Sequence, residues 1–369
     1  MDQDLRPSLH RPKSLTRANQ GAKCLRPVLA IGTIMRVAEP LICELWNAYR
    51  GRWRSGACFH APRSVPAGLC QVGRSDFVVG MRGSFGRIEW PPGADCISEE
   101  DLTVMLKKQK KLILTEANQE AMRRAGRVNG QLMDFLRPQV KAGVTTLSID
   151  KLVHQWTLDH GHKPATLGYQ NYPKSCCTSI NDVICHGIPD AYELKDGDIV
   201  NVDITTIVDG WHGDQSETFL IGEVSEIKRS VTQCAFDCLY AAIDALTPGC
   251  RVSLIGETVV PEAHRRGFSV VREYVGHGLG RQFHLDPSVP HFPNRQSRID
   301  RLYPGMCFTV EPMINGGSRY TRSDKGDGWT VRTKDGYPSA QFEHSILMTE
   351  KGPEILTMTQ NGPKQGFQF

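Results

Sequence analysis

The sequence lacks any apolar stretch long enough to cross a lipid bilayer, and it lacks a CxxC pair of cysteines. No run approaches the roughly 18 apolar residues that indicate a membrane-spanning helix, so we expect no membrane span. The 12 cysteines are scattered and none forms a CxxC pair, while Cys58, His60 and Cys70 are too few and too irregularly spaced for a structural zinc module. We therefore expect free thiols in a reducing cytoplasm.

Positive charge is concentrated in the first quarter of the chain. Of the 369 residues, the first 96 contain 14 Lys and Arg against 7 Asp and Glu, whereas the remainder contains 30 against 33. Three interpretations are open for residues 1–96: a disordered basic arm that contacts nucleic acid or the ribosome, a targeting peptide, and a mis-assigned start with translation beginning at Met81 or Met105. We favour the mis-assigned start or plain disorder, followed by a folded domain from about residue 97.

Two amphipathic helices are predicted early in the folded part. Thr115 is suited to cap a helix whose apolar residues recur at every third or fourth position from Met122 to Leu136. A second helix is predicted from about Ser148 to His160.

An internal repeat is indicated by four glycines. Gly143 and Gly161 lie 18 residues apart, and Gly249 and Gly267 repeat that spacing at an offset of 106 residues. The repeat predicts two α+β halves with the functional site in the cleft between them. Pro261 is a misfit in the last helix of the second half, and we expect it to kink or shorten that helix.

Residues 201–214 read as a β-hairpin that carries two acidic side chains. Apolar and polar residues alternate with the period of two that a strand shows, and Asp209-Gly210 is a favoured two-residue turn. With that turn, Asp214 lies opposite Thr205 and diagonally adjacent to Asp203 on the same face. Two such carboxylates repel unless cations lie between them or one takes up a proton.

Three further candidate metal ligands occur in strand-like or glycine-rich surroundings: His277 between glycines, Glu311 at the end of an apolar strand, and Glu343 within another. A carboxylate in a buried strand is unfavourable unless it is paired, hydrogen-bonded or metal-bound. Together with Asp203 and Asp214, these side chains can hold two divalent ions, for which Mn, Co, Fe or Zn suit mostly oxygen ligands with one nitrogen. Two such ions activate water for attack on an amide carbonyl, so amide hydrolysis is the predicted reaction.

Two other histidines fit a role in catalysis. His186 lies in the sequence Cys-His-Gly-Ile-Pro, and His284 follows His277 by seven residues. Either could donate a hydrogen bond to a scissile amide or to the oxyanion that forms from it. Taken singly, such a histidine is more often an ordinary structural residue.

Several further motifs occur in order along the chain: Gly168-Tyr169, Tyr172 to Ser175, Thr178 to Asn181, Cys185 to Pro189, Asn201 to Asp214, Gly276 to Gly280, Glu311 to Met313 and Gln341 to His344. In these motifs and in their order, the chain from about residue 97 to 360 resembles type I methionine aminopeptidases, which remove the initiator methionine from new polypeptides. The resemblance implies the "pita-bread" fold, an α+β domain with pseudo-twofold symmetry, a central antiparallel sheet and helices outside.

The resemblance also implies roles for the candidate residues. Asp214 and Glu343 fall at positions that bridge both metal ions, His277 and Glu311 at positions that complete one, and Asp203 at the position that chelates the other. His186 corresponds to a histidine near the departing amide nitrogen and His284 to one near the carbonyl oxygen. Glu311 also falls at the position that is often assigned as the proton-handling base in the family.

A pocket for the methionine side chain and a monovalent-cation site follow from the same resemblance. Thr166 falls where some family members carry Cys. In some members a monovalent cation is held by positions matching Asn181, Val183 and Ser339. The positions that match the pocket lining are Tyr169, Tyr172, Cys177, Phe283 and Trp329.

Two rival functions share this fold. One is a prolidase or Xaa-Pro aminopeptidase, and the His186 motif and the Trp329 loop argue against it. The other is a non-catalytic protein that binds ribosomes or RNA. Such relatives have lost metal ligands, whereas all five candidate ligands are present in this sequence. We expect nascent peptide N-termini as substrates, a monomer, possible contact with the ribosome as a partner, and a C-terminal tail at 361–369.

Overall fold

The computed structural model describes residues 78–81, 84–87 and 111–369. The first two ranges are the strands β1 (Val78–Met81) and β2 (Ser84–Arg87), which pair antiparallel. Sequence patterning does not predict this pair, because strands of four residues are too short to show a sustained period. The other predictions made for residues 1–96 fall outside the described residues.

The body that begins at residue 111 is built on the hairpin of β6 (Ile199–Val208) and β7 (Trp211–Leu220). Both residues of the Asp209-Gly210 turn have positive φ, at 52° and 81°, as this two-residue turn requires. The register places Thr205 opposite Asp214. The predicted turn and register are therefore confirmed.

Within the described residues, β6 and β7 belong to a nine-stranded antiparallel sheet with the order β10, β9, β11, β16, β7, β6, β3, to which β17 adds at β16 and β4 at β6. Two sheets of three strands follow the orders β15, β12, β8 and β13, β14, β5. The strands have these bounds: β3 Lys163–Pro164, β4 Cys177–Ile180, β5 Val183–Cys185, β8 Ser269–Val270, β9 Gly276–Gly278, β10 Leu285–Val289, β11 Cys307–Val310, β12 Met313–Asn315, β13 Thr321–Ser323, β14 Val331–Thr333, β15 Ser339–Gln341, β16 Glu343–Thr349 and β17 Gly352–Ile355.

Capping residues set where the first two helices of this body begin. In α3 (Glu116–Leu136) the Thr115 hydroxyl accepts a hydrogen bond from the Asn118 N–H, as predicted. In α4 (Thr146–Asp159) Thr145 caps in the same way, so this helix begins two residues before the predicted Ser148. Short 3₁₀ turns follow at η1 (Arg137–Gln139) and η2 (Tyr169–Asn171).

The second pair of helices is α5 (Glu226–Ala245) and α6 (Ser253–Arg265). Pro261 lies inside α6, and the helix continues for four residues beyond it. Of the two effects predicted for Pro261, a kink therefore stays a prediction, whereas shortening of the helix is not observed. The reason is its position near the C-terminus, where the missing N–H removes one helical hydrogen bond close to the end of the ladder.

The predicted repeat is confirmed by backbone geometry. All four marker glycines have φ between 75° and 82°. Gly143 N–H donates to the Leu194 carbonyl over 2.8 Å, and Gly249 N–H donates to the Leu302 carbonyl over 2.7 Å. The offset of 106 residues also relates β3 to β8, which both follow a helix.

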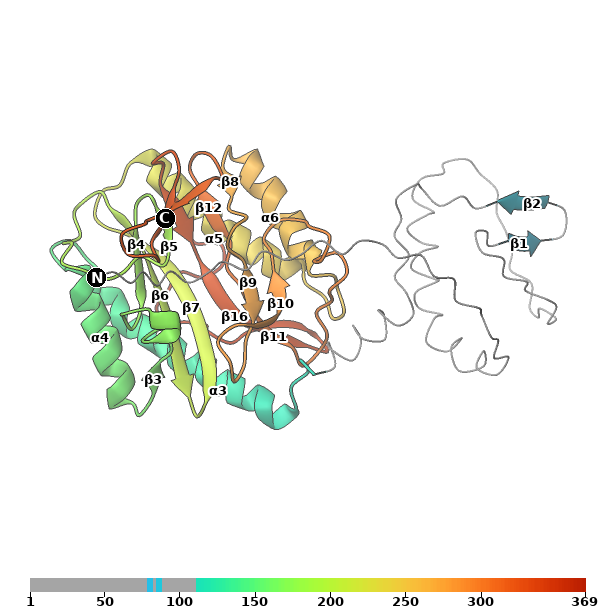
Figure 1. Ribbon diagram of the computed structural model, residues 1–369, viewed down its shortest axis with the longest axis horizontal. Helices are drawn as coiled ribbons and strands as arrows, with labels where there is room; N and C mark the ends of the chain where they lie inside the picture. Colours follow the sequence, from blue (N-terminus) through green and yellow to red (C-terminus); the bar gives the residue numbers. More distant parts are fainter. Residues whose placement is uncertain (1–77, 82–83, 88–110) are drawn as a thin grey trace, which may run out of the picture. The chain divides into compact units, whose positions relative to one another are not determined.

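Each helix pair packs on its own hydrophobic core. Around α3 and α4, Leu132 and Ile149 pack with Ile204 of β6. Around α5 and α6, Ile255 packs with Phe308 of β11. Figure 1 shows the two helix pairs beside different halves of the central sheet, so strands of both halves meet where the functional site was predicted. The predicted α+β architecture is confirmed.

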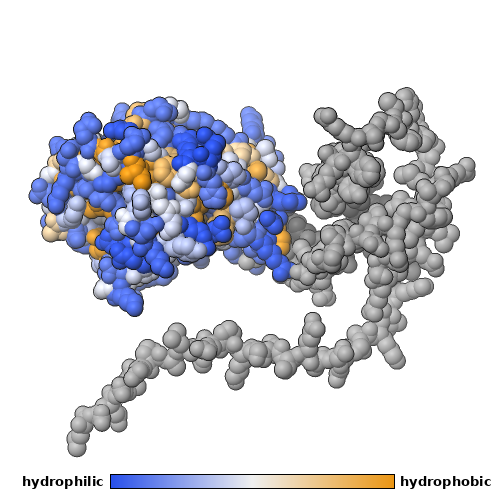
Figure 2. All heavy atoms as spheres, turned by 90° about the horizontal axis from the view of Figure 1, so that it is seen from above, coloured by the Kyte–Doolittle hydropathy of each residue, from blue (hydrophilic) through white to orange (hydrophobic). Residues whose placement is uncertain are grey.

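The surface of the body is mainly hydrophilic on the face shown in Figure 2, with hydrophobic residues in small separate areas. Among the described residues, no helix combines the length and the apolar character needed to cross a membrane. At the C-terminus, the Phe369 ring packs edge-on against Phe236 of α5, with centroids 5.3 Å apart. The last residue of the predicted tail therefore lies on α5.

Candidate metal centre and substrate pocket

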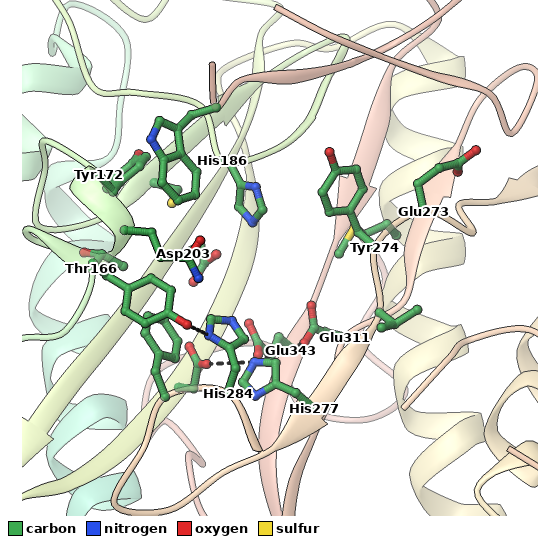
Figure 3. Close-up of a pocket in the computed structure, with 18 residues that line it drawn as sticks. Thr166, Tyr172, His186, Asp203, Glu273, Tyr274, His277, His284, Glu311 and Glu343 are labelled. Carbon is green, nitrogen blue, oxygen red and sulfur yellow. Dashed lines mark hydrogen bonds and ion pairs between the residues drawn. The ribbon is translucent and has the colours of Figure 1, made fainter. Parts of the chain in front are cut away.

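A cavity of about 400 Å³ lies between the two halves (Figure 3). Every metal ligand, catalytic residue and pocket residue predicted from the sequence lines it. Six further residues complete its lining: Thr166, Gln170, Glu273, Tyr274, Val275 and Met313.

Three predicted metal ligands converge closely. Asp214, His277 and Glu343 each place one donor atom so that all three atoms lie within 4.8 Å of one another. Nε2 of His277 lies 3.6 Å from Oδ2 of Asp214 and 3.8 Å from Oε1 of Glu311. Asp203 lines the same cavity, so the structure brings all five predicted ligands to one place.

These donors come from strands of both halves. Asp203 and Asp214 lie on β6 and β7, which pair along their whole length. His277 lies on β9, and Glu311 directly follows β11. Glu343 begins β16, where it pairs with Ser216 of β7. The central sheet therefore positions the cluster through strand register.

Three buried carboxylates and the partly buried Asp203 share one cavity, where they repel each other and lose hydration. Burial raises the pKa of Asp203 to about 7. Burial, together with the charge of neighbouring carboxylates, raises the pKa of Asp214, Glu311 and Glu343 well above the ordinary range. Among the described residues that line this cavity, none is Lys or Arg. The raised pKa values favour proton uptake when no cation is bound, and the surrounding side chains supply no positive charge, so the ionised form of this cluster needs bound cations.

His277 presents a free nitrogen to these carboxylates. Its Nδ1 lies 3.0 Å from the Gly278 carbonyl oxygen, which can only accept a hydrogen bond, so Nδ1 carries the proton. Burial lowers the pKa of His277 to about 3, so the ring is neutral and Nε2 has a lone pair. A lone pair that faces carboxylate oxygens at 3.6–3.8 Å is an arrangement for metal ligation rather than for an ion pair. The residues present therefore fit a divalent metal site.

Sequence reasoning missed the residues that orient the ligands. The Thr309 hydroxyl donates to Oε1 of Glu311 over 2.7 Å and accepts the His277 N–H over 3.0 Å. Gln341 donates to Oε2 of Glu311, and Thr205 donates to Oδ1 of Asp214. These three residues share a signal: Thr205, Thr309 and Gln341 each lie two positions from a candidate ligand. The period of two in strands could have found them.

Aromatic rings surround the rest of the cavity. The Tyr172 and Trp329 rings meet edge-on with centroids 5.1 Å apart, and the ring centroids of Tyr169 and Phe283 are 4.9 Å apart. Burial raises the pKa of the Cys177 thiol, which keeps it neutral. The walls are therefore suited to an apolar, unbranched side chain.

The two predicted catalytic histidines lie in the same cavity. His186 has a positive φ of 58° and contacts the ring of Tyr274 edge-on. Burial lowers its pKa to about 4. The His284 ring lies 4.2 Å from the His277 ring, centroid to centroid, and burial lowers its pKa as well. Both rings are therefore neutral near pH 7 and can donate one hydrogen bond each.

The residues of the predicted monovalent-cation site lie near one another but outside this cavity. The Asn181 carbonyl accepts the Ser339 N–H over 2.8 Å. Asn181 and Val183 line a second cavity of about 480 Å³.

The fold and the first cavity together define an α+β protein with an internal repeat and a carboxylate-rich site for divalent cations. Residues 120–350 match metallopeptidase family M24. Methionine aminopeptidase A of Synechocystis sp. is 47% identical over 247 residues, which are 67% of this chain and 97% of that protein. The methionine aminopeptidase of Escherichia coli K12 is 45% identical over 251 residues, 68% of this chain and 94% of that protein.

A solved structure agrees with these relatives. The crystal structure of methionine aminopeptidase from Rickettsia prowazekii has a TM-score of 0.65 and 44% identity, and the match covers 67% of this chain and 99% of that chain. The chain therefore belongs to metallopeptidase family M24 and, within it, to the methionine aminopeptidases. Family membership implies that it uses divalent metal ions.

More distant structures share the fold alone. The prolidase from Pyrococcus horikoshii has 17% identity and a TM-score of 0.54, and the X-Pro aminopeptidase from Thermotoga maritima has 19% and 0.55. The predicted pita-bread fold is confirmed, and the rival Xaa-Pro activity is not favoured.

Proposed function

We propose that this chain removes the initiator methionine from nascent polypeptides whose second residue is small. The supporting observation is the convergence of Asp214, His277 and Glu343 donor atoms within 4.8 Å, in a cavity with aromatic walls. The identity of 43–47% to proteins named methionine aminopeptidase supports the methionine side chain as the group that the walls hold.

We propose two divalent ions, because four carboxylates offer a charge of −4 to two charges of +2. Asp214 and Glu343 would hold both ions, His277 and Glu311 would complete one, and Asp203 would chelate the other. When bound, the ions supply a polarised carbonyl and an activated water. Mn, Co, Fe and Zn all suit this donor set.

The protein's own residues would then act on the peptide. His284 donates a hydrogen bond to the carbonyl oxygen of the scissile bond, and His186 lies beside the departing amide nitrogen. Glu311 would accept a proton from the attacking water and pass it to the nitrogen of the leaving amine. Thr309 and Gln341 hold the Glu311 carboxylate, because each donates to a different oxygen of it. Tyr169, Tyr172, Cys177, Phe283 and Trp329 hold the methionine side chain.

Peptide hydrolysis before and after chelation tests this proposal. The purified chain should release the first residue from Met-Ala-Ser and not from Ala-Pro-Ser or Met-Leu-Ser. Chelation should abolish release, and adding back Mn, Co, Fe or Zn singly should restore it and rank the metals. Preference for Ala-Pro-Ser would overturn the methionine specificity.

The setting of the activity remains a prediction. We propose a cytoplasmic monomer that meets its substrates as they leave the ribosome. A monovalent cation at Asn181, Val183 and Ser339 would support the segment that carries His186. The catalytic domain is proposed to span residues 97–360.

A further inference from the structure

Glu311 lies at an interruption between two strand pairs that keep one register. β11 pairs with β16 up to Val310, and β12 pairs with β15 in the same register from Met313 onward. That register would place Glu311 opposite Glu343, yet these two residues are not among the strand partners of the described chain. The backbone that carries the Glu311 carboxylate is therefore not held by a neighbouring strand.

The N–H of Glu311 donates to a side chain instead. Its acceptor is Nε2 of His291, 2.9 Å away. Pro312, the next residue, has no N–H, so this is the one hydrogen bond that an N–H of the two-residue link can make. A backbone N–H can only donate, so Nε2 accepts and the neutral ring carries its proton on Nδ1. His291 is only 1% exposed, which shelters the hydrogen bond from water.

The segment that carries His291 also holds the other ligand of the same proposed ion. His291 lies two residues after the end of β10, and β10 pairs with β9, where Ser288 is opposite His277. This segment therefore holds His277 through a strand backbone and Glu311 through the His291 ring. Nε2 of His277 and Oε1 of Glu311 lie 3.8 Å apart, and both were proposed above to complete one ion.

We propose that His291 is a positioning residue, whose ring nitrogen holds the Glu311 backbone at the interruption and so aims the Glu311 carboxylate at one of the two ions. This inference rests on the proposed function, which supplies the two ions. Without the acceptor, the buried N–H stays unpaired, which is unfavourable, or turns to another acceptor and carries the carboxylate with it. Thr309 and Gln341 hold only the carboxylate end of the side chain, so they do not replace this backbone hydrogen bond.

The test compares the parent with His291→Leu, which removes the acceptor, and with His291→Gln, whose side-chain oxygen can take the place of Nε2. Each metal-free protein is titrated with Co²⁺ by calorimetry. In His291→Leu we expect one binding step to weaken about tenfold to 100-fold and the other to change less than about threefold. His291→Gln should keep both affinities within about threefold of the parent. On Met-Ala-Ser, His291→Leu should lower kcat about tenfold or more and leave KM within about twofold, because the pocket walls are unchanged.

Leu132→Ala is the control for lost stability, since Leu132 is fully buried in the core around α3 and α4 and does not line the first cavity. It should unfold at a lower urea concentration and still bind both ions like the parent. Parent-like binding of both ions by His291→Leu overturns the inference. Equal weakening of both steps overturns it too, because it would show a general effect on the fold.

If His291→Leu does not fold, His291→Gln and His291→Asn give the answer. The Asn side chain is one bond shorter, so its oxygen does not reach the position of Nε2. The inference requires that Gln keeps the two affinities of the parent and that Asn loses one of them, and equal affinities of these two variants overturn it. A parent that binds two ions but releases no methionine would instead refute the proposed function.

Discussion

The hydroxyl of Tyr169 lies 2.8 Å from Nδ1 of His284, across 115 residues of sequence. A phenol is a good donor and an imidazole nitrogen a good acceptor, so we infer that the hydroxyl donates and that Nδ1 carries no proton. The proton of the neutral ring is then on Nε2. His284 is thereby prepared to donate from Nε2, the role proposed for it at the scissile carbonyl.

Tyr169→Phe should lower kcat about tenfold, because His284 loses the group that orients its ring and selects its tautomer. The phenyl ring remains, so the KM for Met-Ala-Ser should change little. Tyr192→Phe is the matched control, since Tyr192 donates to Asp198 and does not line the cavity. A Tyr169→Phe enzyme with the kcat of the parent would rule out this orienting role.

Asp203→Asn should weaken binding of the second metal ion and lower activity about 100-fold or more, because one of four carboxylates is lost. The metal-free variant should melt at a higher temperature than the metal-free parent, since less negative charge is then buried. Metal content by mass spectrometry and melting curves with and without chelator check both effects. Asp159→Asn, whose partner is the exposed Gln155, is the control. Parent-like activity of Asp203→Asn would contradict the two-ion proposal.

Thr309→Val should destabilise the protein by about 1–3 kcal/mol and weaken metal binding about tenfold to 100-fold. Thr309 is fully buried, and the change leaves the His277 N–H and one Glu311 oxygen without their partner. Thr309→Ser keeps the hydroxyl and should restore most of both properties. Chemical denaturation and metal titration measure them. Equal metal affinities of the Val and Ser variants would show that this hydroxyl does not orient the ligands.

His186 should make stability fall in acid. Burial lowers its pKa in the folded state to about 4, whereas an exposed imidazole has a pKa of about 6.5. Below pH 6.5 the unfolded chain takes up a proton that the folded chain resists. The contribution of the neutral ring is therefore complete above pH 6.5, and it is lost at up to about 1.4 kcal/mol per pH unit as the pH falls toward 4.

His186→Asn isolates this effect, because Asn tolerates the positive φ of 58° at this position. Urea unfolding of both proteins in chelator at pH 7.5 and pH 5 gives the difference between their unfolding free energies. Between pH 7.5 and pH 5, the unfolding free energy of the parent should fall by more than that of His186→Asn. An unchanged difference would show that His186 takes up its proton equally in both states.

Local sequence predicts those parts of the site that depend on a single hairpin or helix. The turn at Asp209-Gly210 sets the register of β6 against β7, so the relation of Asp203 to Asp214 follows from adjacent residues. Thr115 likewise determines the start of α3 through a neighbour three residues away.

Contacts across long separations could not be predicted in this way. Thr309 meets His277 because β11 pairs with β9, and Gln341 meets Glu311 because β12 pairs with β15. Nothing within either strand specifies its partner.

The division of the ligands between two repeats has a consequence for how the chain could be cut. A fragment ending at residue 221 would contain Asp203 and Asp214 but no imidazole ligand, and its complement would contain His277, Glu311 and Glu343. Neither fragment alone would contain the full set of proposed metal ligands. Metal binding by a mixture of the two fragments would therefore show that they had reassembled, because the ion needs ligands from both.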